Sequence, residues 1–498
     1  MKSGTVIGIV ILALVITSVT TYQISSNKNS TPTNSEEVRQ QLELQFGSLV
    51  EFEFDEQTEN ISGIHIDAQC LESDATFELL GTLTKLRTLS LRHGRFKDED
   101  LRPLSQLKQL TSVELQSLNF NGSGLQHLKQ SKGIKSLKLS NNPSWNPKES
   151  IWLQELPLLE HLELAFTEAD DSTLSSLAGH TELKTLILDQ TAVSSQVMEQ
   201  LSNHPQLSHL SLRGCNLGKQ PSDAFKKFIT ETPLILNLSK SNISDSTLAH
   251  LKKLPLVQLD LSQTNVSDVG LRHLAGHQFL QQLDLSFTQC ADLGLLETLP
   301  TLPLELLSLR GLHLSERVLQ SLGNCDSLET LSLADTNITD SWLSELSNVK
   351  ALEHLILYNT QVKGHELKSL AVLPGLSYLD LSNCPVDADG IEQLKSLTAL
   401  TSLELIGVPL NQQAMDHLVK VPLSHLNLSN SPIDGNDLKS LSAMPELKGL
   451  IIRNCSVTRF EFEMFQTRNT NCVIYWQEYG FDSTYAKPEA MQAMTIGR

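Results

Sequence analysis

The feature that most restricts the fold of this chain is a recurrence of leucine. Pairs of apolar residues separated by one residue return at intervals of about 24 residues along most of the chain. The first members of these pairs are Ile64, Leu89, Val113, Leu137, Leu162, Leu186, Leu210, Leu236, Leu259, Leu283, Leu307, Leu331, Leu355, Leu379, Leu403, Leu426, Leu450 and Val473. Because alternate residues of a β-strand point to the same side, each pair predicts a short strand that buries two aliphatic side chains.

The length of the chain supports the same interpretation. A chain of 498 residues would ordinarily divide into several globular domains, because compact cores stop growing near ~250 to 300 residues. A stack of repeats avoids this limit, since each repeat contacts only its neighbours. Aromatic residues make up only 5% of the chain, which suits a narrow core built from one recurring aliphatic side chain. The sequence therefore predicts a solenoid.

A well-developed repeat has three parts, as in LVQLDLSQTNVSDVGLRHLAGH from Leu256. After the strand comes a turn, and the fifth position after the first strand leucine forms a turn column whose small hydroxyls are expected to bond the backbone. These hydroxyl residues are Thr167, Thr191, Ser241, Thr264, Thr288, Thr336, Thr360 and Ser431. A short helix follows, with N-caps expected from the pairs Ser244 and Asp245, Ser267 and Asp268, and Thr339 and Asp340.

The cysteines lack the spacing of a disulfide framework. Four of them fall in the turn column or in the apolar column two positions later: Cys215, Cys384, Cys455 and Cys290. We expect these four to be small core residues. Three others have no place in the repeat: Cys70, Cys325 and Cys472.

At this point a family resemblance is clear. The segments LDLSQTNVSDVGLRHL and LSLADTNITDSWLSEL resemble the leucine-rich repeats whose turns carry cysteine and threonine, and the whole chain resembles exported bacterial leucine-rich-repeat proteins with an N-terminal anchor. The resemblance implies an α/β solenoid of horseshoe form, with a parallel concave sheet of about 18 strands and short convex helices. It does not imply one activity, since function lies in sites carried by the fold.

The first residues predict a membrane-targeting segment. Residues 5–22 carry no charge and are mostly Val, Ile, Leu and Ala, which is about the length that spans a bilayer. The alternative is a cleaved signal peptide, because the strictly apolar part is within that shorter class. Lys2 precedes the segment, and Glu36 and Glu37 follow it, so the positive-inside bias places the repeats outside the cytoplasm. We expect a single-pass membrane protein, or a secreted or periplasmic protein after cleavage.

The organisation of the chain follows from these segments. Residues 1–22 form the anchor or signal peptide, and 23–47 form a flexible linker rich in Ser, Thr and Asn. Residues 48–476 form the solenoid with its two caps, and 477–498 form a C-terminal tail without repeat pattern. One repeat departs from the rest at Asn141–Leu153, where prolines exclude the usual helix start. There Trp145 either binds a partner or belongs to a tolerated irregularity whose Trp152 fills the core.

Charge and motifs restrict the function. The net charge of −19 disfavours binding to nucleic acid, which basic surfaces neutralise. Phosphate-binding, dinucleotide-binding, zinc-protease and serine-hydrolase motifs are absent from the sequence. We therefore expect no catalysis, no cofactor and no metal, and membrane contact through residues 5–22 alone.

The predicted concave face consists mostly of Ser, Thr, Asp, Gln and Glu, with one local exception. This exception comprises five candidate partner-binding residues on two adjacent predicted strands: His354, Ile356, Tyr358, Tyr378 and Asp380. Tyrosine is favoured at interfaces because it buries a large area and keeps a polar tip. The alternative is chance composition, since scattered exposed apolar residues are common. We expect a scaffold that binds a protein or a glycan; the alternative is a structural, self-associating envelope component.

The N-terminal prediction is tested by the mass of the mature protein. If residues 5–22 are an uncleaved anchor, the protein isolated from its native membrane keeps the full mass of 55.1 kDa and resists alkaline extraction. Intact-mass spectrometry of the extracted protein is the measurement. Loss of about the first 22 residues would show cleavage and a released protein instead.

Overall fold

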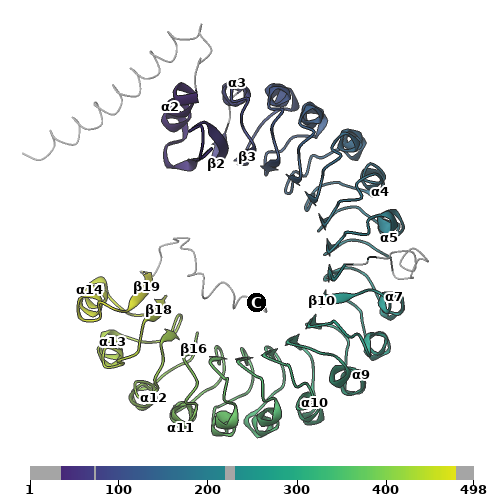
Figure 1. The fold of residues 1–498 in the computed structure, drawn as a ribbon. Helices are drawn as coiled ribbons and strands as arrows, with labels where there is room; N and C mark the ends of the chain where they lie inside the picture. Colours follow the sequence, from purple (N-terminus) through teal and green to yellow (C-terminus); the bar gives the residue numbers. More distant parts are fainter. Residues whose placement is uncertain (1–34, 72–73, 219–229, 231, 478–498) are drawn as a thin grey trace, which may run out of the picture. The chain divides into compact units, whose positions relative to one another are not determined.

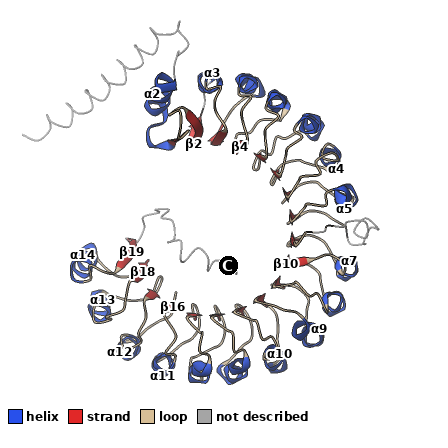
Figure 2. Ribbon diagram, in the orientation of Figure 1, coloured by secondary structure: helices blue, strands red, loops and turns tan. Residues whose placement is uncertain are grey.

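The computed structural model of the chain describes residues 35–71, 74–218, 230 and 232–477. The chain forms two compact units, Met1–His180 and Thr181–Arg498. In each unit the strands lie side by side on the concave side and the helices line the convex side (Figures 1 and 2). The fold class is thus confirmed as an α/β solenoid of the leucine-rich-repeat class.

The first unit contains β1 to β6 among its described residues. Its elements, with 3₁₀ helices written η, are α2 (Ser35–Phe46), η1 (Gly47–Leu49), β1 (Val50–Phe54), β2 (Ile61–Leu71), α3 (Asp74–Thr82), β3 (Thr88–Gly94), η2 (Asp98–Gln106), β4 (Ser112–Gln116), η3 (Ser123–Gln130), β5 (Ser136–Lys138), η4 (Pro147–Glu155), β6 (His161–Glu163) and α4 (Asp171–Ser175).

The second unit contains β7 to β19. Its elements are β7 (Thr185–Ile187), α5 (Val197–Gln200), η5 (Leu201–Asn203), β8 (His209–Ser211), β9 (Leu234–Asn237), α7 (Asp245–Leu251), β10 (Leu256–Asp260), α8 (Asp268–Leu271), η6 (Arg272–Leu274), β11 (Gln282–Asp284), α9 (Asp292–Thr298), η7 (Leu299–Thr301), β12 (Leu306–Ser308), α10 (Glu316–Leu322), β13 (Thr330–Ser332), η8 (Asp340–Asn348), β14 (His354–Ile356), η9 (Leu367–Val372), β15 (Tyr378–Asp380), α11 (Ala388–Gln393), η10 (Leu394–Ser396), β16 (Ser402–Glu404), α12 (Gln412–Leu418), β17 (His425–Asn427), α13 (Gly435–Leu441), β18 (Gly449–Arg453), α14 (Arg459–Arg468) and β19 (Val473–Gln477).

The strand register follows the leucine recurrence, with one correction. In the first unit the column runs in parallel register from Ile64 to Leu162, and in the second it runs from Leu186 to Leu450. At the last strand Ile474 pairs with Leu450, so the predicted column member Val473 is wrong by one residue. Val473 is 58% exposed, because a slip of one residue moves a strand side chain to the other face.

The turn column forms the predicted hydrogen bonds. Each threonine hydroxyl donates to the carbonyl oxygen three residues earlier, at 2.6 to 2.8 Å; these are Thr167, Thr191, Thr264, Thr288, Thr336 and Thr360. Ser241 does the same, whereas Ser431 donates to Leu405 O of the preceding repeat at 3.0 Å. These bonds satisfy carbonyls that stacking removes from water, each contributing ~1 kcal/mol.

The cysteine predictions are also confirmed. Cys215, Cys384 and Cys455 donate to carbonyls of the preceding repeat, and they are buried together with Cys290. The unassigned Cys325 and Cys472 prove to be buried as well. Cys70 lies in β2, and its side chain is outside the described residues. Burial raises the pKa of Cys290 and of Cys325 to about 11, so both thiols stay protonated at neutral pH.

The residue just before the turn column adopts a left-handed backbone in every repeat from β3 to β18. The residues with positive φ at this position are His93, Ser117, Asn141, Phe166, Gln190, Gly214, Lys240, Gln263, Phe287, Gly311, Asp335, Asn359, Asn383, Gly407, Asn430 and Asn454. Asn and Gly adopt this conformation at low cost, whereas a larger side chain costs roughly 1 to 2 kcal/mol. Phe166 and Phe287 are therefore among the costly choices in the column.

The acidic residues that start the helices link neighbouring repeats. Ser267 is an N-cap as predicted, but its partner Asp268 occupies the first helical position and accepts from Ala291 N of the next repeat at 2.6 Å. Asp245 bonds Ser267 N at 2.7 Å in the same way. Asp340 accepts from Gly364 N of its next repeat at 2.8 Å. The prediction that these aspartates belong to local caps was thus incomplete, because each caps the turn of its neighbour.

The N-terminal end of the solenoid is closed by α2 and β1. The antiparallel strand β1 pairs Phe52 with Ile64 of β2. In α2, Val38 is 1% and Leu42 is 0% exposed. The predicted linker at 23–47 was therefore too long, because its last residues, Ser35–Phe46, form this helix. Residues 1–34 lie outside the described residues.

The irregular repeat at Asn141–Leu153 is corrected in two respects. Trp145 is only 1% exposed, so the hypothesis that it binds a partner is wrong, and Trp152 is 4% exposed. Pro147 does not prevent a helix but begins η4, behind the Asn146 N-cap. The first helical position lacks an intrahelical acceptor, so a missing N–H costs nothing there.

Asn142 provides a test of the turn column. Its buried amide donates to Leu115 O and Leu139 O at 2.8 and 2.7 Å, and its oxygen accepts from Leu118 N and Asn119 N. We expect Asn142→Ala to lower the free energy of unfolding by roughly 3 kcal/mol, because buried backbone groups lose their partners.

The measurement is urea unfolding followed by tryptophan fluorescence, which reports on the buried Trp145 and Trp152 of the same unit. The control is Ser144→Ala, at an exposed residue that bonds only the side chain of Asn119 at 2.9 Å. Its expected effect is below ~0.5 kcal/mol. Equal effects of the two variants would contradict the assigned role of Asn142.

Candidate functional site

The candidate binding residues lie on adjacent strands of the second unit. His354 and Ile356 belong to β14, and they pair in register with Tyr378 and Asp380 of β15. Tyr358 follows β14, two residues after Ile356. The structure therefore brings all five together on the inner face, as the repeat alignment predicts.

Their accessibility differs from the expectation. His354, Ile356 and Tyr358 are partly exposed, but Tyr378 is only 6% and Asp380 only 2% exposed. The rings of His354 and Tyr378 meet edge-on with centroids 5.9 Å apart. Tyr378 thus supports His354 from the neighbouring strand and does not itself form an open surface.

Asp380 has a structural task as well. Its Oδ1 accepts from Ser382 N at 2.8 Å, in an Asp-Leu-Ser sequence that closes the end of the strand. The same arrangement recurs at Asp260, which accepts from Ser262 N at 2.9 Å. Asp380 is therefore part of a local strand-end motif, and the residue type alone does not distinguish that task from binding.

An arginine that sequence reasoning missed completes this surface. Arg310, after β12, lies between two aromatic rings, with its guanidinium carbon 5.5 Å from the centroid of Phe287 and 5.7 Å from that of Tyr358. Its Nε donates to Asp335 Oδ2 at 2.6 Å. We call Phe287, Arg310, Asp335 and Tyr358 the aromatic–arginine cluster.

The backbone explains how the cluster forms. Phe287 and Asp335 both occupy the left-handed column, at φ of 54° and 56°, which turns their side chains along the strand ends. Gly311 makes room for the first ring, since a Cβ there would lie 2.3 Å from Phe287 Cδ1. Asn359 Nδ2 donates to Asp335 Oδ1 at 2.6 Å and holds the carboxylate from the other side. The sequence signal was an aromatic residue in a column that favours Asn and Gly, and Phe166 of the first unit shares this signal.

The contacts of Phe287 do not offset the free-energy cost of its backbone conformation. The left-handed conformation costs a bulky residue roughly 1 to 2 kcal/mol, whereas a cation–π contact contributes ~0.5 to 1 kcal/mol at an accessible site. The Phe287 side chain is also 45% exposed, so burial offsets little of this cost. Strained residues that persist without such compensation are often found at functional sites.

The inner face beside the cluster is acidic. Burial raises the pKa of Asp284 on β11, and the like charge of Asp260 on β10 raises it further, against the effects of the Ser286 hydrogen bonds and of Arg310. A carboxyl group whose ionised form is destabilised by burial thus lies next to the cluster.

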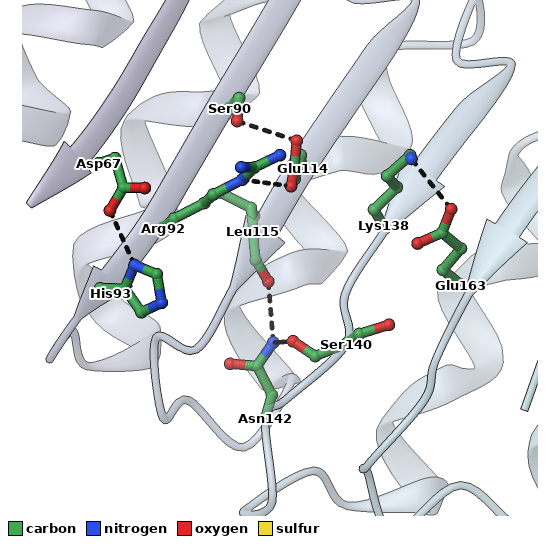
Figure 3. A network of polar contacts seen from close by, with 10 residues as sticks. All are labelled: Asp67, Ser90, Arg92, His93, Glu114, Leu115, Lys138, Ser140, Asn142 and Glu163. Atoms are coloured by element: carbon green, nitrogen blue, oxygen red, sulfur yellow. Dashed lines mark hydrogen bonds and ion pairs between the residues drawn. The ribbon is translucent and has the colours of Figure 1, made fainter. Parts of the chain in front are cut away.

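The inner face of the first unit is polar and internally paired (Figure 3). Arg92 Nε bonds Glu114 Oε1 at 2.6 Å, and this bond raises the pKa of the guanidinium. Lys138 pairs with Glu163 at 3.0 Å. A hollow of about 640 Å³ lies beside them, lined by residues of η1, β1, β2 and β3 that include Leu49, Glu51, His65, Asp67, Ser90 and Arg92. The paired charges favour a rigid polar wall over a reactive centre.

Two further properties concern only the described part of the chain. Within residues 35–71, 74–218, 230 and 232–477, no group of three or more His, Cys, Asp or Glu is placed to hold a metal ion. No helix in these ranges has the length and apolar character that crossing a bilayer requires. The predicted anchor at residues 5–22 lies outside them.

Comparisons with known proteins give similarities of fold. No family model matches the chain, and no curated protein matches it. The similar solved structures include the following three. An internalin from Listeria monocytogenes is 18% identical, with 69% of this chain and 93% of that chain covered and a TM-score of 0.49. A leucine-rich-repeat protein from Leptospira interrogans is 17% identical over 82% and 93%, with a TM-score of 0.41. The plant peptide hormone receptor RGFR1 in complex with RGF2 is 17% identical over 85% and 78%, with a TM-score of 0.40.

The raised pKa of Asp284 predicts a gain of stability on its replacement. Asn427 holds the equivalent place on β17 and accepts from Ser429 N at 3.0 Å, so Asp284→Asn should keep its hydrogen bond. At pH values above the raised pKa, the ionised carboxylate of Asp284 destabilises the folded state. This effect vanishes below the ordinary pKa of 3.8, where the carboxyl group is protonated in the folded and in the unfolded chain. We expect a higher Tm for the variant at pH 7 and equal Tm values near pH 3.

Thermal unfolding across that pH range is the measurement. The control is Asp416→Asn at an exposed position on α12, which should show no such pH dependence. A lower Tm of Asp284→Asn at pH 7 would show that the charge of Asp284 stabilises the fold.

Proposed function

We propose that this chain is a noncatalytic scaffold that binds a protein partner through the inner face of its second unit. The observation that carries the proposal is the aromatic–arginine cluster together with His354 and Ile356. Phe287, Tyr358 and Arg310 are of the residue types that contribute most at protein interfaces. Because the cluster spans four consecutive repeats, its side chains are fixed before a partner arrives, and little conformational entropy is lost on binding.

The partner is expected to meet a partly desolvated centre with an acidic border. The side chains of Arg310 and Asp335 are only 22% and 19% exposed, so a hydrogen bond from a partner to either would form in a low local dielectric. Asp260 and Asp284 border the cluster and favour a partner with complementary positive charge, which speeds association. Residues 5–22 would hold this surface outside the cytoplasm, either as a retained anchor or, after cleavage, as a released protein.

The experiment places a photo-crosslinking phenylalanine analogue at Phe287 of the full chain in its native membrane. The matched control carries the analogue at Phe166, which occupies the same repeat position at φ 56° and is similarly exposed, at 49%. We expect one defined adduct from position 287 and none of that mass from position 166.

The captured protein is then purified and its affinity measured. We expect Phe287→Asn combined with Tyr358→Ala to weaken binding at least tenfold, because the aromatic anchors supply much of the free energy of binding. Asn suits the left-handed backbone, so the variant should keep its Tm. Phe166→Asn is the control, with a change below about twofold. Unchanged affinity of the double variant would contradict the proposed site.

Two alternatives give different results. A glycan ligand would produce no protein adduct, but binding to a glycan array would depend on the same aromatic rings. A self-associating envelope component would crosslink to a second copy of itself, and the purified chain would form oligomers as its concentration rises. A defined heteromeric adduct distinguishes the proposed recognition function from both.

A further inference from the structure

The hollow of about 640 Å³ in the first unit has no task in the proposed function. It is lined by residues of β1, β2 and β3, among them His65 and Arg92, and beside them by Ser48 and Leu49 of η1. Its volume lies within the range of small-molecule sites, ~300 to 1,000 Å³. The Leu49 side chain is 51% exposed, so an apolar group borders this otherwise charged space.

Most charges around the hollow are already paired (Figure 3). Glu114 accepts from Ser90 Oγ at 3.0 Å and from Arg92 Nε at 2.6 Å, so both of its carboxylate oxygens are used. Asp67 pairs with His93 at 2.7 Å. These contacts hold the side chains of the sheet in place before a ligand arrives, which lowers the entropy lost on binding.

Two groups of opposite charge on the hollow remain without such a partner. Within the described ranges, the Glu51 carboxylate forms no hydrogen bond or ion pair. The Nη1 and Nη2 groups of Arg92 likewise donate to no acceptor in the part of the chain that the structure describes. His65 lies on the strand between them, but it pairs with Glu53 at 2.9 Å. One carboxylate and one end of a guanidinium are thus left to meet a ligand.

The strand register sets the separation of these two charged groups. Glu51 pairs with His65, and His65 pairs with Ser90. Glu51 therefore lies two strands from Arg92 and is offset from it by two residues, about 10 Å across the sheet and about 7 Å along it. The two long side chains close part of this distance. A free α-amino acid, whose charges are one carbon apart, does not bridge the rest, whereas each further residue adds ~3.3 Å.

We propose that the hollow binds a short peptide, of two or three residues, through its free amino and carboxyl termini. The ammonium group of the peptide pairs with Glu51, and its carboxylate accepts hydrogen bonds from the Nη groups of Arg92. An apolar side chain of the peptide covers Leu49. This inference does not depend on the inner-face site of the second unit.

The lining disfavours other classes of small ligand. A phosphate or another plain anion is repelled, because Glu51, Asp67 and Glu114 outnumber the single Arg92. A glycan lacks a stacking surface, since no Phe, Tyr or Trp is among the residues that line the hollow. A zwitterion carries no net charge and satisfies both of the unpartnered groups.

Calorimetric titration of the full chain tests the proposal, with a panel of unblocked dipeptides of Gly, Ala, Val and Leu as the probes. We expect at least one dipeptide of the panel to bind. N-acetylation and C-terminal amidation of that dipeptide should each weaken binding at least tenfold, because each block removes one charge-assisted contact.

Two substitutions assign each terminus to its residue. In Glu51→Gln, N-acetylation should change the affinity less than about twofold, because the partner of the ammonium group is already lost. Arg92→Lys keeps a positive charge beside Glu114 but lacks the additional donors, so amidation should lose its effect there. The controls Glu56→Gln and Arg95→Lys, at exposed positions outside the lining, should keep both tenfold effects.

Three results would overturn the proposal. The first is that no dipeptide of the panel binds. The second is that amidated dipeptides bind as tightly as free ones, which would identify a site for cations alone. The third is an effect of N-acetylation that persists in Glu51→Gln, which would place the ligand elsewhere. The Tm of each variant is measured in parallel, and we expect it to match that of the unmodified chain within about 2 °C.

Discussion

The structure depends on satisfying the backbone carbonyls that stacking buries at the end of each strand. A carbonyl there has lost water, and it is shielded by the repeats on both sides. Thr360 donates to Leu357 O at 2.8 Å, and Cys384 of the next repeat donates to the same oxygen at 3.0 Å. One carbonyl oxygen thus accepts hydrogen bonds from two repeats, so the stacking of these repeats depends in part on hydrogen bonding. Thr, Ser and Cys recur in the turn column because their small side chains reach the oxygen without displacing the leucines.

Further bonds between neighbours reinforce this stack. Aspartates at the first helical position cap the turn of the following repeat, and Asn142 joins five backbone groups of two repeats. Stability in such a chain is close to a sum of repeats and of the contacts between them. Local substitutions are therefore expected to act mainly on the repeats that they join.

The same backbone creates the opportunity for function. A left-handed residue before each turn directs its side chain along the ends of the strands, where Asn and Gly cost little. Replacing one of these by Phe287 places a ring beside Arg310, and Tyr358 completes the enclosure two repeats after Arg310. The recognition surface thus arises from a few departures in a column that otherwise serves the fold.

The sequence by itself determined the elements that repeat. The strand columns, the hydroxyl bonds of Thr167 and its equivalents, and the burial of Cys215 follow from a fixed position within one repeat, where backbone geometry leaves little choice. The sequence likewise placed His354 and Tyr378 side by side, because parallel register at constant period makes equivalent residues neighbours.

Only the tertiary structure decided what depends on contacts between unlike residues of different repeats. It placed Arg310 between Phe287 and Tyr358, buried Trp145, and shifted the last column from Val473 to Ile474. The direction of a long side chain and the packing of an irregular repeat are set by the neighbours that it meets in space. A pattern of period 24 contains no information on those neighbours, and so it fixed the scaffold but not the surface that the scaffold displays.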